Sequence, residues 1–479
     1  MRIANRKLQT EELVELRKEV LAQWPTGAEV DLDEAFAYCA ALPKEKNYSA
    51  RLVRAKREGS VLLVPQFGRA TFEEMLEGIQ YVERQSGGDG LWTLYPDAYT
   101  RKGRFDRAQA GLEASRREGT SMLSGWPVVN YGVEYARRLQ ESAAMPFQNV
   151  SSDEDSRLQT EITLASGWSG YSARSLQEVT AHCKNIPLDR MIWFNHYENR
   201  LAGLYTEKGF PAAAVTAAHL TGYDIAGYRV LTVLTQFLLA AEQGVKHLHA
   251  SMGLGMNLVQ DVAMLKAVAR LGQRYLERSG HGDVVLTVGT YPYLGDWPRD
   301  AEGAQALIAW NAVIAILGGA QAMKLKCVDE AFSTPTKEGM AAAAKITRQL
   351  LRIVGGQTLC GGEELDLEQE MIEREVEAVM AKIYELGDGD LAQGMVKGVE
   401  LGVIDTVFSP WRFFKGKVLV VRDARGAVRY LDAGNIPLPA EVREYHREKI
   451  AERERVEGVR ADLDMAIKDI TWASEPLLR

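Results

Sequence analysis

The sequence predicts an α/β fold, a parallel α/β barrel with an N-terminal helical extension and a C-terminal α+β extension. Short, wholly apolar runs alternate with helical segments, which is typical of a parallel sheet covered on both faces. The alternation continues without a break between residues 60 and 330. A doubly wound sheet shares this pattern, but the length of the uninterrupted run favours the barrel. We expect the three parts at residues 1–54, 55–400 and 401–479.

One strand–helix–strand unit is legible near the start of the barrel. Residues 61–65 are an apolar run of the kind that forms a buried parallel strand. Thr71 is followed three residues later by Glu74, a capping-box signature that predicts the start of a helix. The glycines of residues 87–90 end this helix, and residues 91–95 are the next strand.

The same pattern predicts the elements of the rest of the chain. Charged segments with apolar stripes over about residues 10–55 predict helices before the barrel. Further strands are expected at residues 146–150, 191–194, 213–217, 247–251, 284–290 and 322–326, with helices at 231–243, 258–277 and 304–317. An amphipathic helix is expected over 367–383. The C-terminal part is expected to hold a hairpin of 417–421 with 428–431 and a charged helical tail over 443–468.

The composition narrows the class of protein. Of 479 residues, 46% are hydrophobic and 25% are charged, which excludes intrinsic disorder. A net charge of -8 argues against a general nucleic-acid binder, which needs a basic face. The 4 cysteines include no CxxC pair, so we expect neither a zinc ribbon nor a disulfide scaffold. With no signal peptide and no membrane segment in view, the expected location is the cytoplasm.

In a parallel barrel, functional side chains lie at the carboxyl ends of the strands. Gln66 follows the first strand, and Arg101 lies a few residues beyond the second. Lys326 ends the strand 322–326, and Glu330 comes four residues later. Lys326 at such a position is suited to an anionic or hydroxyl-bearing ligand, and a solvated surface lysine is the equally weighted alternative.

Other patterns are weaker. The basic segment 100–104 could bind a carboxylate or phosphate, but composition alone favours an exposed turn. His247 and His249 share one face of a predicted strand, and a structural pair is favoured over a metal pair because no carboxylates follow the adjacent strands. Residues 253–257 lack the third glycine of a dinucleotide loop, and neither a P-loop nor a GxSxG motif occurs.

Several segments, in the same order and over nearly the whole chain, resemble one known family. They are residues 43–48 (PKEKNY), 97–101 (DAYTR), 155–158 (DSRL), 240–246 (AAEQGVK), 335–338 (PTKE), 385–410, 421–423 and 429–431. The chain resembles the large (epsilon) subunit of glutamate mutase, also called methylaspartate mutase. The resemblance implies a (β/α)8 TIM barrel and an isomerase that uses adenosylcobalamin to rearrange a carbon skeleton through radicals.

The resemblance also implies partners. In such enzymes the cobalt is usually held by the histidine of an Asp-x-His-x-x-Gly motif on a small subunit. None of the 7 histidines here has an Asp two places before it. We therefore expect a separate small cobalamin-binding subunit, a homodimer of this chain, and a heterotetramer in all, with no nucleic acid and no membrane as partner.

Residue by residue, the coenzyme half of the family's site is kept. Lys326 and Glu330 match the positions that hold the adenosyl ribose, and Gly68 matches a glycine close to the adenosine. Arg101 matches an arginine that grips the substrate and lies near the corrin. The resemblance thus implies that these four residues bind the coenzyme, and that Arg101 also contacts the substrate.

The substrate half differs from the family's pattern. Gln66 stands at the first position of its arginine claw, and Val150 stands at the third. Ser172 stands at the position of the amine-binding Glu, and Glu178 and His182 stand at two Tyr positions. Losing two guanidinium groups would leave a substrate dicarboxylate poorly compensated in a dry pocket, at a cost of several kcal/mol.

Three hypotheses follow from these differences. The first is a mutase whose substrate is not glutamate, with one carboxylate held by Arg101 and with Glu178 or His182 serving an amine or acting as acid or base. The alternative to this role is that Glu178 and His182 are loop residues without a function in the site. The second is a true glutamate mutase with a rearranged clamp, for instance through Arg174. The third is a non-catalytic scaffold for a cobalamin subunit, against which the retained Lys326 argues.

Overall fold

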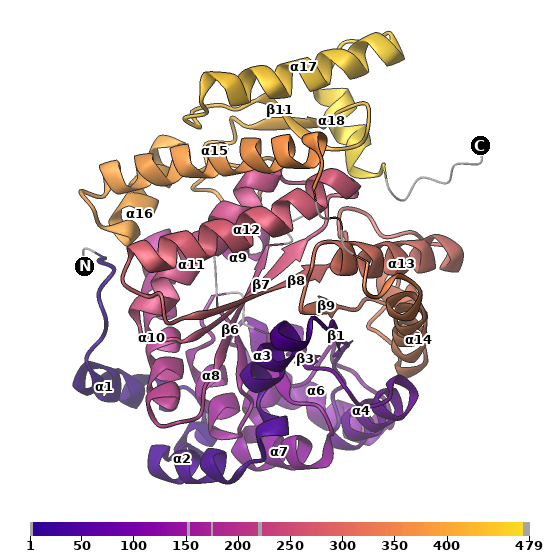
Figure 1. Cartoon of the computed structure of the whole chain (residues 1–479). Coiled ribbons are helices and arrows are strands. Elements are labelled where there is room, and N and C mark those ends of the chain that lie inside the picture. The colour runs from indigo at the N-terminus through magenta and orange to yellow at the C-terminus, as the bar shows by residue number, and fades with distance from the viewer. Residues whose placement is uncertain are drawn as a thin grey trace.

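The computed structural model describes residues 3–150, 154–173, 176–218, 223–357, 359 and 361–472. A ring of parallel strands lies inside a layer of helices, and the C-terminal elements stack against one side of this assembly (Figure 1). No helix within these ranges is long and apolar enough to cross a membrane.

Over the described residues, the central sheet has 9 strands in the order β1-β9-β8-β7-β6-β5-β4-β3-β2, and every pair is parallel. The strands are β1 (Leu62–Val64), β2 (Gln66–Phe67), β3 (Trp92–Leu94), β4 (Phe147–Asn149), β5 (Gly170–Ser172), β6 (Ala213–Ala218), β7 (His247–Gly253), β8 (Val285–Tyr291) and β9 (Ala322–Lys324).

The first and last strands in the ring are two halves of one strand, separated only by Pro65. On one side, the Leu91 N–H donates to the Leu63 carbonyl over 2.9 Å, next to β3. On the other side, the Leu325 N–H donates to the Val64 carbonyl over 3.0 Å, next to β9. The halves therefore close the sheet on itself, and the prediction of a (β/α)8 barrel is confirmed.

Helices separate the barrel strands and cover their outer face. They are α4 (Phe72–Ser86), α5 (Ala98–Arg101), α6 (Phe105–Glu118), α7 (Val128–Ser142), α8 (Arg157–Ala165), α9 (Leu176–His182), α10 (Leu188–Glu207), α11 (Ala226–Glu242), α12 (Leu258–Arg278), α13 (Ala301–Leu317) and α14 (Lys337–Val354). The predicted cap of α4 is present: the Thr71 hydroxyl accepts the Glu74 N–H over 3.4 Å and donates to its carboxylate over 2.8 Å.

Most predicted strands coincide with observed ones, but the strand expected at residues 191–194 is wrong. These residues belong to α10, which is buried all round along its second half. A short apolar run without period cannot distinguish a buried strand from a buried helix. In its place the barrel uses β5, three residues that begin with glycine and end with serine, which carry no apolar run to reveal them.

The N-terminal extension contains α1 (Thr10–Leu21), η1 (Pro25–Glu29), α2 (Leu32–Ala41), η2 (Lys44–Lys46) and α3 (Tyr48–Glu58). The C-terminal region contains α15 (Glu363–Leu386), α16 (Leu391–Leu401), the hairpin β10 (Leu419–Arg422) and β11 (Val428–Asp432), α17 (Ala440–Glu457) and α18 (Leu463–Ile470). The charged tail is thus two helices rather than one, because Gly458 adopts a left-handed φ of 68° and ends α17. The boundaries at residues 54 and 400 remain predictions.

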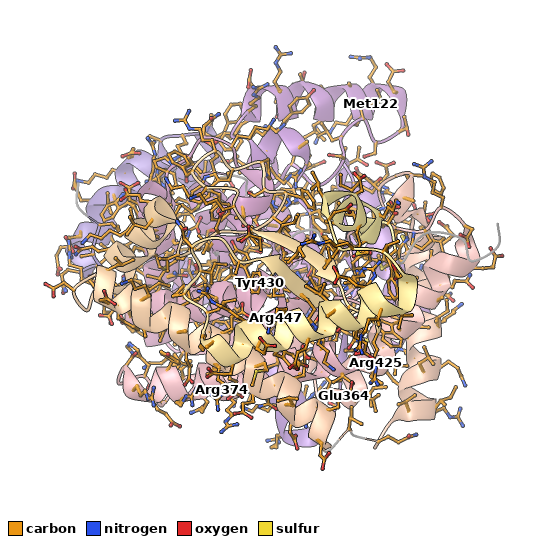
Figure 2. All side chains as sticks on the ribbon, turned by 90° about the horizontal axis from the view of Figure 1, so that it is seen from above. Met122, Glu364, Arg374, Arg425, Tyr430 and Arg447 are labelled. Atoms are coloured by element: carbon orange, nitrogen blue, oxygen red, sulfur yellow. The ribbon has the colours of Figure 1, made fainter. Side chains whose placement is uncertain are left out.

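Ion pairs fasten the C-terminal hairpin to the long helix α15. The buried Arg429 guanidinium contacts Glu368 of α15 over 2.7 Å. The exposed Arg425, in the turn of the hairpin, contacts Glu364 over 2.6 Å (Figure 2). Because α15 packs on α11 and α12 of the barrel, these pairs tie the hairpin to the barrel through one helix.

Candidate active site

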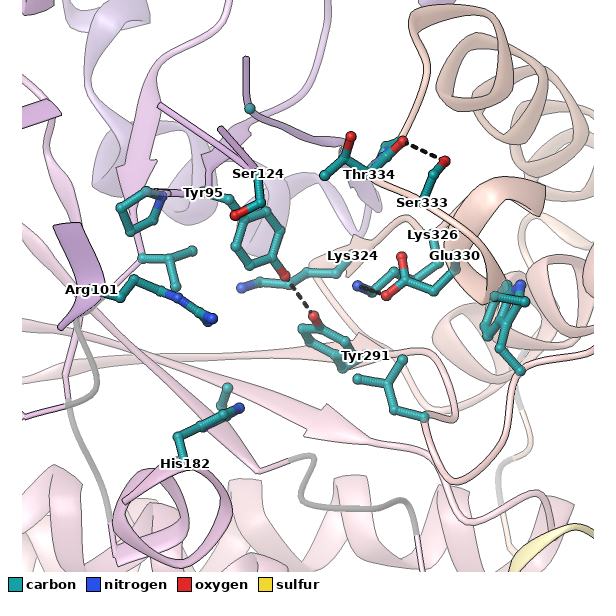
Figure 3. A pocket seen from close by; sticks show the side chains of 18 of the residues that line it. Tyr95, Arg101, Ser124, His182, Tyr291, Lys324, Lys326, Glu330, Ser333 and Thr334 are labelled. Carbon is teal, nitrogen blue, oxygen red and sulfur yellow. Dashed lines mark hydrogen bonds and ion pairs between the residues drawn. The ribbon is translucent and has the colours of Figure 1, made fainter. Parts of the chain in front are cut away.

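A cavity of about 690 Å³ opens at the carboxyl ends of the barrel strands (Figure 3). The structure brings seven of the eight predicted site residues to its lining, namely Gly68, Arg101, Ser172, Glu178, His182, Lys326 and Glu330. These residues come from segments far apart in the sequence, and closure of the barrel brings their strand ends together. This end of a barrel is where catalytic residues of this architecture lie.

One wall of the cavity, which we call the Lys326 wall, consists of Gly68, Lys326 and Glu330. Lys326 lies just beyond β9, and Glu330 lies on the short helix η3 (Val328–Ala331). The Lys326 ammonium donates to the Glu330 carboxylate over 2.6 Å. Lys326 is buried, so the alternative of a solvated surface lysine is wrong. The wall therefore offers a donor and an acceptor side by side.

Two tyrosines adjoin this wall. Burial lowers the pKa of Lys326, but its electrostatic interactions with Tyr291, Tyr95 and the Glu330 carboxylate outweigh burial and hold this pKa well above its usual value. The two phenol oxygens are 2.8 Å apart, and the rings lie 5.6 Å and 5.7 Å from the Lys326 ammonium. Lys326 is therefore a permanently charged donor in this cavity.

Gln66 lies beneath the cavity rather than in its lining. Its side chain is wholly buried, and its amide oxygen accepts the Tyr95 hydroxyl over 2.8 Å. The Tyr291 hydroxyl is 3.5 Å from the same oxygen. The sequence suggests that Gln66 contacts a ligand directly, but the structure buries Gln66 below the cavity lining. Gln66 instead supports the two tyrosines that line the cavity.

The opposite wall, which we call the Arg101 wall, consists of Arg101, Ser172, Glu178 and His182. Arg101 is the last residue of α5, a helix whose first turn is capped by the Asp97 carboxylate through N–H groups at 2.8 Å and 3.2 Å. The Arg101 side chain points into the cavity (Figure 3). The other basic residues of segment 100–104 are exposed. Arg101 therefore fits the interpretation of this segment as an anion-binding site, and the others fit the interpretation as an exposed turn.

Helix α9 supplies the acid and the imidazole of the Arg101 wall. Glu178 and His182 are one turn apart, and their Oε1 and Nδ1 atoms lie 3.1 Å apart. Both side chains lie on a helix and line the cavity, so the alternative that they are loop residues away from the site is wrong. Ser172 ends β5, and its hydroxyl accepts a hydrogen bond from the Gln148 amide over 3.1 Å. Arg174 lies outside the described residues.

Comparison with known proteins decides the family. The family model "Methylaspartate mutase E chain (MutE)" matches residues 42–478. The chain belongs to that family. The glutamate mutase epsilon subunit of Desulfitobacterium hafniense is 38% identical over 98% of this chain and 97% of its own. Those of Treponema denticola and Escherichia coli O157:H7 are 34% and 35% identical, over 100% of this chain and 99% of each relative.

Membership in this family confirms the predicted resemblance and the predicted class of enzyme, a mutase and hence an isomerase. Among solved structures, the tryptophan synthase alpha chain from Legionella pneumophila aligns with a TM-score of 0.37 at 11% identity, over 66% of this chain and 100% of that one. This likeness is too remote to carry an argument.

The cavity of this mutase-family chain also contains a lysine that sequence reasoning missed. Lys324 ends β9, lines the cavity and is only 5% exposed. Burial lowers its pKa to about 7, with the charge of Lys326 acting in the same direction and that of Glu178 opposing both. The alternation of a strand puts residues 324 and 326 on one face, which is the signal that could have revealed it.

The histidine pair does not line the cavity. His249 is buried within the barrel, and its Nδ1 lies 2.9 Å from the Thr287 hydroxyl. Burial lowers its pKa to about 3, and the charge of Lys324 adds to this effect. Over the part of the chain that the structure describes, no three or more His, Cys, Asp and Glu residues are grouped to hold a metal ion.

Proposed function

We propose that the chain is the large catalytic subunit of an adenosylcobalamin-dependent carbon-skeleton mutase whose substrate is an amino acid or small carboxylic acid other than glutamate. The observation that carries the proposal is the contrast within one cavity. The Lys326 wall holds three of the four residues that the family resemblance assigns to the coenzyme, and the fourth, Arg101, lines the opposite wall. Gln66 and Val150, in contrast, stand where the resemblance implies arginines.

The residues of the Lys326 wall fit the adenosyl group of this coenzyme. A ribose presents neighbouring hydroxyls, each able to donate and accept, and the Lys326–Glu330 pair offers a charged donor 2.6 Å from a charged acceptor. Gly68 faces backbone so closely that an added Cβ would lie 2.9 Å from the Tyr95 carbonyl oxygen. A side chain at this position would therefore crowd the wall that we assign to the adenosine.

The cobalt ligand is assigned to another chain. The absence of an Asp-x-His motif among the 7 histidines supports a small cobalamin-binding subunit as its source. With a homodimer of the large chain, the assembly would be a heterotetramer. When bound, the coenzyme supplies the radical that removes and returns a substrate hydrogen.

The chain's own residues bind, orient and shield. Lys326 and Glu330 hold the ribose, and the Arg101 guanidinium holds a substrate carboxylate through its planar fork. The Glu178 carboxylate binds a substrate amine or, with His182 at 3.1 Å, holds a proton at the cavity lining. The barrel walls keep water away from the reacting atoms.

The changed residues support a substrate other than glutamate. Gln66 is neutral and lies below the lining, and Val150 is apolar, so neither replaces a guanidinium. A true glutamate mutase with a rearranged clamp is the second candidate, and the cation of Lys324 is the observation that favours it. A scaffold without catalysis is disfavoured, because it has no need of a paired Lys326 and Glu330.

Reconstitution of the full chain with its cognate small subunit and adenosylcobalamin tests the proposal. Candidate amino acids and short carboxylic acids are offered one at a time. We expect loss of the intact coenzyme's absorption spectrum and an EPR radical signal with an acid other than glutamate. Conversion of glutamate to 3-methylaspartate would establish the second candidate, and no radical signal with any acid would establish the scaffold.

A further inference from the structure

The two lysines at the end of β9 point the same way but differ in how their charges are compensated. Lys324 and Lys326 are two residues apart, so both face the inside of the barrel. Lys326 is neutralised by Glu330 at 2.6 Å. Lys324 is as deeply buried, yet it forms no ion pair with a carboxylate within the described ranges.

Among the residues that the structure describes, four basic side chains line the cavity, Arg101, Arg299, Lys324 and Lys326, together with three carboxylates, Glu178, Asp296 and Glu330, so protonation of Lys324 leaves one positive charge in excess. Lys326 repels the Lys324 ammonium from its own strand, and Glu178 of α9 attracts it from across the cavity. His249 lies deeper in the barrel, where burial and the Lys324 charge keep its imidazole neutral. The Lys324 ammonium lies 5.3 Å from the ring of Tyr291, and its side chain points toward Arg101 (Figure 3).

The position of Lys324 is fixed by the fold. Its carbonyl oxygen accepts a hydrogen bond from the Asn311 side chain of α13 over 2.9 Å, and its register in β9 aligns it with Val64 of β1. A buried ammonium without a counter-charge destabilises a protein, and an apolar side chain of similar length would avoid this cost. The contact with the Tyr291 ring offsets only a small part of it.

The missing group is therefore an anion that enters the cavity. A carboxylate suits both cations, since it accepts the N–H groups of an ammonium on one side and a planar guanidinium fork on the other. We propose that Lys324 binds a substrate carboxylate from the wall opposite Arg101 and thereby makes the cavity specific for small carboxylic acids. The identity of this ligand as a substrate rests on the proposed function, but the binding itself does not.

Competition for the lysine amine tests binding without turnover. The full chain, alone and with its small subunit and adenosylcobalamin, is treated with a trace of acetic anhydride at pH 7, and acetylation of each lysine is followed by peptide mass spectrometry. Glutarate and glutamate are the probes, with glutaramide as the neutral match and inorganic phosphate as another anion. Lys345, exposed on α14, reports the reagent itself.

We expect glutarate or glutamate to slow acetylation of Lys324 about fivefold, because a bound carboxylate that raises the amine pKa from about 7 by one unit lowers its neutral fraction at pH 7 from about one half to about one eleventh. Glutaramide and phosphate leave the rate unchanged, and Lys345 reacts equally in every mixture. An unchanged Lys324 rate with both acids overturns the proposal. Equal protection by phosphate overturns its specificity for carboxylates.

Variants of the reconstituted enzyme separate binding from a structural role. Lys324→Met is expected to raise KM for the acid that is turned over at least tenfold while kcat changes less, and Lys324→Arg recovers most of the loss. Lys345→Met is the matched control. A KM unchanged in Lys324→Met, with turnover intact, overturns this inference and leaves the proposed function standing. Protection of Lys324 without turnover of any acid supports this inference and contradicts the proposed function.

Discussion

The two lysines at the end of β9 differ in where their counter-charges come from. Lys326 has the Glu330 carboxylate at 2.6 Å, so this part of the cavity is neutralised before any ligand arrives. Lys324, whose side chain points across the cavity toward Arg101 (Figure 3), is buried without such a carboxylate in the described part of the chain. A lysine with its own counter-charge suits a ligand that is neutral at that point, such as a sugar. A lysine without one suits a charged ligand.

This difference is consistent with retention of the Lys326–Glu330 pair beside positions that depart from the pattern implied by the family resemblance. A paired wall is a unit, because changing either partner leaves the other buried and uncompensated. A cation that binds the ligand directly can instead be exchanged for another at a different position in the cavity. Gln66 and Val150 stand where the family resemblance implies arginines, and Lys324 supplies a cation at another position. Together these features are consistent with a cavity that binds an acid in a new geometry.

The largest effect is expected from breaking the paired wall. Lys326→Met should lower kcat/KM roughly a hundredfold to a thousandfold, because Glu330 is left without its partner and repels electron-rich ligand atoms. Turnover at varied adenosylcobalamin measures the loss, and the double variant Lys326→Met/Glu330→Gln should lose less than the sum of the two single variants. Unchanged turnover in Lys326→Met would reject the ribose assignment.

Removal of the uncompensated charge should instead stabilise the fold. Burial holds the pKa of Lys324 at about 7, against 10.5 for an ordinary lysine. Below pH 7 both the folded and unfolded chains hold the proton, so the full penalty is present. Between pH 7 and 10.5 the unfolded chain binds more protons, and the penalty shrinks as pH rises.

Lys324→Met should therefore raise the free energy of unfolding by about 2–4 kcal/mol at pH 6, and by progressively less toward pH 10. Denaturant unfolding of both proteins across this pH range measures the difference, with exposed Lys345→Met as the control. A gain that is independent of pH would show that packing, and not the buried charge, is responsible.

The Arg101 wall should respond less steeply. Arg101→Lys keeps the charge but loses the planar fork, and we expect kcat/KM to fall about thirtyfold to a hundredfold. KM for the substrate acid should rise more than the apparent Kd for adenosylcobalamin changes. The opposite order would move Arg101 from the substrate to the coenzyme.

The smallest effect is expected from Glu178→Gln, about threefold to tenfold in kcat/KM. The Glu178 charge raises the pKa of Lys324, so its loss should move the pH profile of Lys324 acetylation to lower pH. His182→Asn is the control within the same pair, because it keeps the Glu178 carboxylate. An equal shift in both variants would contradict a direct effect of Glu178 on Lys324.

Local signals predicted most of the fold. Apolar runs and the Thr71 cap act over a few residues, so strands such as β6 and β7 and the start of α4 follow from the sequence. The strand expected at residues 191–194 is wrong because burial on all sides removes the periodicity that separates helix from strand. The strand β5 is missed for a different reason: it has almost no apolar side chains, and an apolar run is the signal that marks a buried strand.

The features of the candidate site also fall into those that residue identity determined and those that depend on the tertiary structure. The sequence by itself determined the family, and it supplied the residues on which the proposed site rests, Lys326 and Glu330 for the coenzyme and Gln66 and Val150 for the altered clamp, because these are properties of residue identity and order. Only the tertiary structure decided that Gln66 lies beneath the lining, that α9 turns Glu178 into the cavity, and that Lys324 is buried without a partner. Desolvation and charge pairing depend on distances between residues far apart in the chain, and closure of the barrel sets those distances.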